Sequence, residues 1–365
     1  MKKDIKIFNI FVTIIFLLAY SSCRKDENIT PIEDPIDDTG VSVNLSLVPY
    51  AKLSDYRFFS GEMSDQYPSE KVLAYAPASS LFTDYALKKR FVWMPAGTKA
   101  QYIADSELLD FPTGTALIKS FYYEDMLPNG DTKIIETRVM IKKSTGWIFA
   151  EYVWNEDQTE AFLQMDGSYQ QISWLQDGNQ KSTNYRIPSA VECLICHKSN
   201  NSPVPIGLKP QNLNVDYEYD DGAMNQIQKL IQEGYLQPNV PGNIVSTVNY
   251  SDPQQPLDLR LRSYVDINCA HCHAENSHCD YRPMRLAFSE TALSINMGVC
   301  VEPDEFINPS LINIITPGNF NKSMMHFRLA STEESTRMPL LGRSLVHQEG
   351  LELLTQYIQS ISDCD

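Results

Sequence analysis

Hydrophobic and polar positions alternate over much of residues 45–182, which is typical of half-buried β-strands. Three segments, 116–123, 133–142 and 146–154, are rich in β-branched and aromatic residues, and turn residues such as PNGD and STG separate them. Residues 45–182 are therefore predicted to form a β-rich antiparallel domain. All four tryptophans of the chain are expected in its core or at its rim: Trp93, Trp147, Trp154 and Trp174.

From about residue 183 onward, apolar positions recur instead at helical spacing, but only in short stretches. These are 224–234, RLRSYVDINCAHC, and SLVHQEGLELLTQYIQSI near the C-terminus, with long Pro- and Asn-rich loops between them. Short helices joined by long loops favour a domain organised around a large cofactor. The predicted fold class is α+β multidomain: the β-rich domain, then a mainly α-helical region with segments 183–268 and 269–365.

The N-terminus reads as an export signal. Three lysines precede an apolar run over residues 7–20, which is shorter than the ~20 residues of a spanning helix. The run ends in YSSC, which resembles a lipobox without its usual leucine, so 1–22 is predicted to be a signal peptide and Cys23 the lipidated residue. A retained N-terminal anchor helix is the alternative. The acidic, Pro-punctuated residues 23–44 are predicted to be a flexible tether. The expected location is periplasmic or cell-surface, anchored through lipid to a membrane, with the outer membrane favoured.

The formal net charge of −16 argues against nucleic acid as a partner and is compatible with docking a basic electron-transfer protein. Outside the cytoplasm cysteines tend to pair, and seven remain beyond Cys23. If four of them carry cofactors, a Cys279–Cys300 disulfide is expected, with Cys364 free.

One cysteine motif occurs twice: Cys193-Leu-Ile-Cys196-His197 and Cys269-Ala-His-Cys272-His273. In a c-type haem site the two cysteines form thioethers to the haem and the adjacent histidine ligates the iron. A shared zinc site, a redox dithiol and disulfides are the alternatives. Zinc would leave the histidine after each pair without a role, and the pairs are farther apart than zinc ribbons place theirs. Two covalently bound haem c groups are therefore predicted.

The sequence indicates a sixth iron ligand for the second haem but leaves that of the first haem open. Met338 is expected to ligate the second haem, because it stands in a Met-Pro pair just before the last predicted helix. The 269–365 segment is also long enough for one cytochrome c domain. For the first haem, Met224, His347 and an open position all remain candidates. The other histidines are expected to face solvent or pack: His271, His278 and His326.

The chain also resembles the SO2930 family of diheme c-type cytochromes. The stretches that carry the resemblance include LFTDYALKKRFVWMPAGTKA, NYRIPSAVECLICHK, PIGLKPQNLN, DINCAHCH and RMPLLGRSLVHQEG, and it spans most of residues 53–361. It implies haem binding at both motifs and places Met338 in a matching Met-Pro. It includes His347 but not Met224.

The predicted function is electron transfer in the cell envelope, with a redox partner protein there. An enzyme of the diheme peroxidase or oxidase type, with an open first haem, is the first alternative. The second is a module in residues 45–182 that binds a partner or glycan, with the haem region attached to it.

Overall fold

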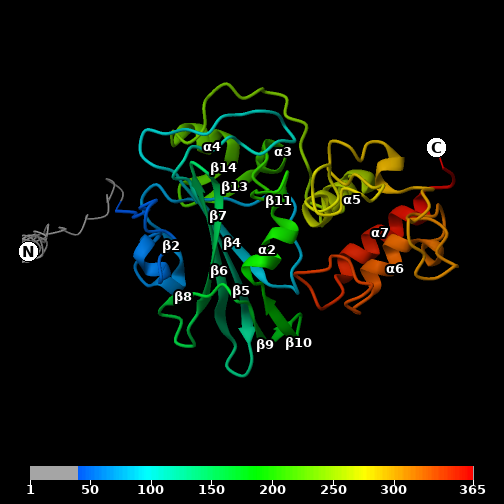
Figure 1. Cartoon of the computed structure of the whole chain (residues 1–365), viewed down its shortest axis with the longest axis horizontal. Coiled ribbons are helices and arrows are strands. Elements are labelled where there is room, and N and C mark those ends of the chain that lie inside the picture. The colour runs from blue at the N-terminus through cyan, green and yellow to red at the C-terminus, as the bar shows by residue number, and fades with distance from the viewer. Residues whose placement is uncertain (1–39, 365) are drawn as a thin grey trace, which may run out of the picture. The chain divides into compact units, whose positions relative to one another are not determined.

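A computed structural model describes residues 40–364. Its main feature is an eight-stranded antiparallel sheet in the order β10-β9-β5-β6-β7-β8, with β4 on β5 and β3 on β4 (Figure 1). The strands are β3 Leu73–Ala74, β4 Leu87–Trp93, β5 Ala116–Met126, β6 Asp131–Lys143, β7 Gly146–Trp154, β8 Ala161–Leu163, β9 Ser168–Gln176 and β10 Asn179–Ile187. The three strands predicted from alternation are confirmed as β5, β6 and β7, and all four tryptophans are buried.

Both faces of the sheet are covered, which explains why its strands alternate only partly in polarity. On one face Phe91, Ile118 and Val139 pack in a core with the N-terminal residues. That core already includes Val41, which is 1% exposed, so packing begins at Val41 rather than near residue 45. On the other face, Val92 belongs to a second core that includes residues of the helices after β10.

Small two-stranded hairpins and short helices complete the fold. The hairpins are β1 Phe59–Ser60 with β2 Tyr67–Pro68, β11 Lys198–Ser199 with β12 Ser202–Pro203, and β13 Asp216–Tyr219 with β14 Gly222–Asn225. The α-helices are α2 Ala190–Cys196, α3 Pro210–Leu213, α4 Gln226–Gln232, α5 Leu257–Val265, α6 Met324–Ala330 and α7 Gln348–Ser360. A single π-helical turn, Asp266–Ala270, continues α5, and single 3-10 turns lie at Leu53–Tyr56, Met63–Asp65, Ser294–Met297 and Phe320–Lys322.

The predicted fold class is wrong. The regular structure of residues 40–364 is mostly β-sheet, with 20% helical residues, and no mainly α-helical cytochrome region follows the sheet. The longest α-helix among these residues is α7, with 13 residues. The helical stretches read from the sequence do form, but as short elements joined by irregular chain. Prolines between α5 and α6 are one reason, because proline lacks the N–H that continues a helix: Pro283, Pro303, Pro309 and Pro317.

Hydrogen bonds tie the sheet to the C-terminal residues. The Asp84 carboxylate, just before β4, accepts from the backbone N–H groups of Ser344 and Leu345 at 2.7–2.9 Å. The backbone N–H of Phe82 donates to Asn268 Oδ1 at 2.8 Å. Asn268, next to the second cysteine motif, and residues 344–345 are thus fixed against the loop that precedes β4.

Candidate functional site: two cavities around the cysteine motifs

The second motif begins in the π-helical turn after α5. The Asn268 side chain donates to the carbonyl of Tyr264 at 2.9 Å, and the N–H groups of Cys272 and His273 both donate to the carbonyl of Cys269 at 3.0 Å. The chain therefore makes one tight turn between the two cysteines. This turn brings both sulfurs and the following imidazole to the wall of one cavity.

We call this space the C-terminal cavity; it holds about 1140 Å³, including its open mouth. Cys269, Cys272 and His273 line it, and Met338 lines it from a distant part of the chain. The rest of its wall is mainly apolar, including Leu261, Leu286, Ile314, Met324, Met325 and Leu354.

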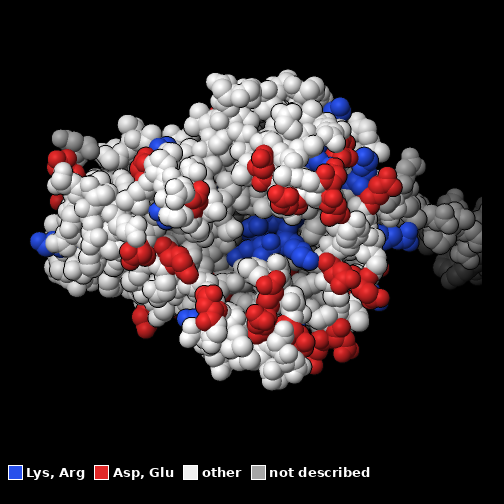
Figure 2. All heavy atoms as spheres, turned by 180° about the vertical axis from the view of Figure 1, so that it is seen from behind, with Lys and Arg blue, Asp and Glu red and all other residues white. Residues whose placement is uncertain are grey.

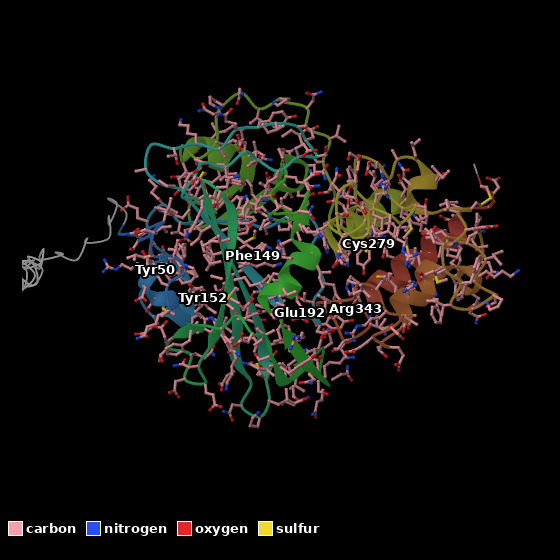
Figure 3. The ribbon with its side chains drawn as sticks, in the orientation of Figure 1. Tyr50, Phe149, Tyr152, Glu192, Cys279 and Arg343 are labelled. Carbon is pink, nitrogen blue, oxygen red and sulfur yellow. A yellow bond between two sulfur atoms is a disulfide. The ribbon has the colours of Figure 1, made fainter. Side chains whose placement is uncertain are left out.

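The Met338 backbone is held firmly at that wall. Its N–H donates to the carbonyl of Arg328 at 3.1 Å, and its carbonyl accepts from Nε and Nη2 of Arg343 at 2.9 and 2.7 Å. Arg343, labelled in Figure 3, is itself buried. The structure thus places the predicted ligand Met338 in the same cavity as His273.

The first motif lies on α2, whose start is fixed by a capping box. Ser189 caps the helix and the Glu192 side chain returns to the Ser189 N–H at 2.7 Å, while Arg186 pairs with Glu192 at 2.6 Å. The helix ends at His197, directly after Cys196. The helix thus presents Cys193 and Cys196 one turn apart, with His197 immediately beyond.

The His197 ring is oriented by two contacts. Its Nδ1 lies 2.9 Å from the carbonyl of Val204, and its ring meets the ring of Phe149, which is labelled in Figure 3, edge-on at 5.3 Å between centroids. A hydrogen bond at Nδ1 fixes the tautomer and leaves Nε2 for a metal. Burial lowers the pKa of His197 to about 4, so its imidazole is neutral at neutral pH, as a ligand must be.

Cys193, Cys196 and His197 line a second space, the sheet cavity, of about 1390 Å³ with its open mouth. Residues of one face of β4, β5, β6 and β7 also line it. The cross-strand register places four charged residues in one row across this face: Arg90 opposite Lys119, Lys119 opposite Arg138, and Arg138 opposite Glu151. All four line the sheet cavity.

One half of this row is internally neutralised. Arg138 lies 2.5 Å from the fully buried Glu136 and 3.0 Å from Glu151, and Tyr185 donates to Glu136 at 2.6 Å. Burial alone would raise the pKa of Glu136, but Arg138 holds it below its usual value. Burial, and then the neighbouring Glu136, raises the pKa of Glu151 well above its usual value.

The other half carries positive charge only. Arg90 is 8% exposed, and its guanidinium has no hydrogen bond or ion pair among residues 40–364. Burial, and then the adjacent Arg90 and Arg138, lowers the pKa of Lys119 well below its usual value. The Lys119 ammonium contacts the Phe121 ring at 4.7 Å, which compensates a buried cation only in part.

The two cavities meet at the cysteine motifs. Cys196 and His271 line both of them. The ligand atoms of Cys196, His271 and Cys272 all lie within 4.8 Å of one another. As a free thiol Cys196 has a pKa well below its usual value, because it hydrogen-bonds with Cys272 and lies beside His271. Two sulfurs and one imidazole are also ligands that zinc accepts, so this cluster is the alternative site that the geometry offers.

The residues around both motifs fit covalent haem. The four motif cysteines are unpaired, each pair lies on its own cavity, and a neutral histidine follows each pair. Burial lowers the pKa of His273 to about 4, and its Nδ1 has no hydrogen-bond partner within residues 40–364. Cys193, Cys196 and His197 would hold one group. Cys269, Cys272, His273 and Met338 would hold the other.

The remaining candidate ligands lie elsewhere. Met224 is in strand β14 rather than in a helix, and His347 is stacked on Phe82 at 4.1 Å with its Nδ1 3.1 Å from the Tyr264 hydroxyl. Neither Met224 nor His347 is among the described residues that line a cavity. His278 is exposed and His326 packs on Phe320, as predicted. His271 instead lies between the two cavities, a position that its place in the motif did not suggest.

The predicted disulfide is wrong. Cys300 is bonded to Cys364, not to Cys279, and Cys279 is unpaired and buried at the wall of the C-terminal cavity. Spacing in the sequence favoured the nearer cysteine, but the loop after α7 returns the C-terminus to Cys300. Cys23, the signal peptide and most of the tether lie outside the described residues. Within residues 40–364 no helix combines the length and the apolar character needed to cross a membrane.

Comparison with known proteins adds nothing to this picture: no family model, curated protein or solved structure matches the chain. The resemblance to diheme cytochromes therefore stays a prediction. The charged row of the sheet was missed at the sequence level. The one sequence feature that indicates it is the strand LKKRFVW. Lys88 and Arg90 are two residues apart and therefore lie on the same face of this strand, whose last residues are apolar.

Proposed function

We propose that this chain is a diheme c-type cytochrome lipoprotein that transfers electrons in the cell envelope. One observation carries the proposal. The two cysteines and the following histidine of each motif line one cavity together, and the cavity of the second motif also contains Met338. Zinc at the Cys196 cluster would use one cysteine of each motif and leave Cys193 and Cys269 without a role.

Haem c supplies a one-electron ferric/ferrous couple, and a methionine ligand raises its potential. His197 and His273 are held neutral and buried, ready to bind iron. The shared position of Cys196 in both cavities supports exchange of electrons between the two groups inside one chain. Export and a lipid anchor at Cys23 would place this pair beside an envelope partner.

The test is the number of covalent haems per chain after expression with a c-type maturation system. Pyridine haemochrome absorbance against protein concentration, with intact mass, should give two. The double variant Cys193→Ser/Cys196→Ser should carry one, and Cys279→Ser, which alters a cavity cysteine outside the motifs, should keep two. A chain with no haem and bound zinc would overturn the proposal, and loss of that zinc in Cys196→Ser would assign the metal to the three-residue cluster.

One observation favours a second candidate, an enzyme of the peroxidase or oxidase type. Neither Met224 nor His347 reaches the sheet cavity, while the ionisable residues Glu151 and Arg138 do. Such enzymes need one iron with an open position and acid–base groups near it. A high-spin first haem that turns over peroxide would favour this candidate, and two low-spin haems without turnover would exclude it.

A further inference from the structure

We propose that Arg90 and Lys119 bind the propionate carboxylates of the haem attached at Cys193 and Cys196. The inference rests on the proposed function and deepens it. It makes the sheet a wall of the first haem site, rather than a separate binding module.

The argument starts from the register of the sheet. Arg90, Lys119 and Arg138 are direct cross-strand neighbours on one face, and like charges placed directly opposite each other destabilise a sheet. Arg138 has two carboxylates beside it, Glu136 and Glu151. Neither Arg90 nor Lys119 forms an ion pair with a carboxylate among residues 40–364, and Glu136 raises the pKa of Lys119 by less than its cationic neighbours lower it.

Burial makes this arrangement more costly. A buried cation needs a paired anion to offset the loss of its hydration. Arg90 is 8% exposed and borders the sheet cavity, and burial lowers its pKa from the usual value. The nearby Lys88 cannot supply the missing negative charge, because it is itself a cation. Its ammonium donates to the carbonyl of Ala86.

The location of the two cations indicates which anion they bind. They line the same cavity as Cys193, Cys196 and His197. Haem c carries two carboxylates on the side of the ring away from its thioether bonds. Figure 2 shows a recessed group of basic side chains with acidic side chains around it, on the face of the molecule that is turned away in Figure 1.

The test compares two charge-neutralising variants on the same strands. Arg90→Gln/Lys119→Gln removes the two cations, whereas Lys89→Gln removes a positive charge from the opposite face of β4, where Lys89 donates to the carbonyl of Asp65 at 3.0 Å. Both are made in the full-length protein, and haem content is measured first. If the wild type carries two haems, the proposed function stands, and a negative result with the variants then counts against this inference alone.

The decisive readout is the redox-difference infrared spectrum of protein whose haem is ¹³C-labelled at the propionate carboxyls. The double variant should shift the carboxylate band of one haem and lower the midpoint potential of that haem, because ferric iron is favoured when positive charge is lost. Lys89→Gln should leave the band in place, and the conservative pair Arg90→Lys/Lys119→Arg should restore it.

Two results would overturn the inference. One is a labelled band that stays unmoved in the double variant. The other is a saturable change of the haem spectrum with acetate or inorganic phosphate that is lost in the double variant while the labelled band stays unmoved. That result would assign the cations to a free anion instead of the propionates.

Discussion

The two cavities share a motif but differ in where the rest of the wall comes from. The C-terminal cavity takes nearly all of its residues from positions 261–354, and its wall is mainly apolar. The sheet cavity draws residues from Tyr75 to Gly342, and its wall carries the charged row of four strands. An apolar wall with a methionine would suit a haem of high potential, and a charged wall would let the protein tune the potential of the other proposed haem. The C-terminal cavity is therefore expected to respond to loss of its methionine, and the sheet cavity to loss of charge.

The largest effect should come from Met338. In Met338→Ala the haem at His273 should lose its thioether ligand, so its midpoint potential should fall strongly, while the haem at His197 should keep its own. Potentiometric titration followed by absorbance resolves the two components. Met325→Ala, which alters another methionine of the same cavity, is the control. If Met325→Ala lowers the potential and Met338→Ala does not, the ligand has been misassigned.

A large loss of stability is expected from Arg138 in the sheet cavity. Arg138→Met would leave the buried carboxylate of Glu136 without its cation, which costs about 3–5 kcal/mol of the free energy of unfolding. Arg186→Gln breaks the half-exposed pair with Glu192 and should cost about 1 kcal/mol or less. Denaturant unfolding of both variants measures the difference. Equal losses would mean that the charged row is no more important than a surface ion pair.

The C-terminal part of the chain also contains a covalent link. Cys364→Ser opens the bond to Cys300, which closes a chain separation of 64 residues, and should cost about 2–4 kcal/mol. The free Cys300 thiol should then react with a maleimide. Cys279→Ser is the control, because Cys279 is unpaired. A variant as stable as the wild type would show that the C-terminal bond contributes nothing to stability.

The same contrast explains what could be predicted from sequence. Strands 116–123, 133–142 and 146–154, the two motifs and Met338 are local patterns, and the structure places each of them as strand or cavity residue. Arg90 and Lys119 become neighbours only through the register of β4, β5 and β6, and strand propensity does not determine that register. The Cys300–Cys364 bond depends likewise on where a distant loop returns. The helical region was overestimated because short apolar periodicity does not reveal how far each helix extends between prolines.

The smallest effect should be a pH dependence at the charged row. Burial and Glu136 raise the pKa of Glu151 well above the usual value of 4.5, so the folded protein holds a proton on this carboxyl that the unfolded chain releases. The folded state is therefore favoured below about pH 4.5 by this group, and that advantage is lost as the pH rises toward the folded pKa. Glu151→Gln keeps the size of the side chain and removes the titration.

The melting temperature of Glu151→Gln should therefore exceed that of the wild type at pH 8, and the gap should close toward pH 5. Glu156→Gln, at an exposed site in the turn after β7, is the matched control and should show no such trend. The opposite sign, with Glu151→Gln less stable at pH 8, would mean that Glu151 is ionised and paired with Arg138.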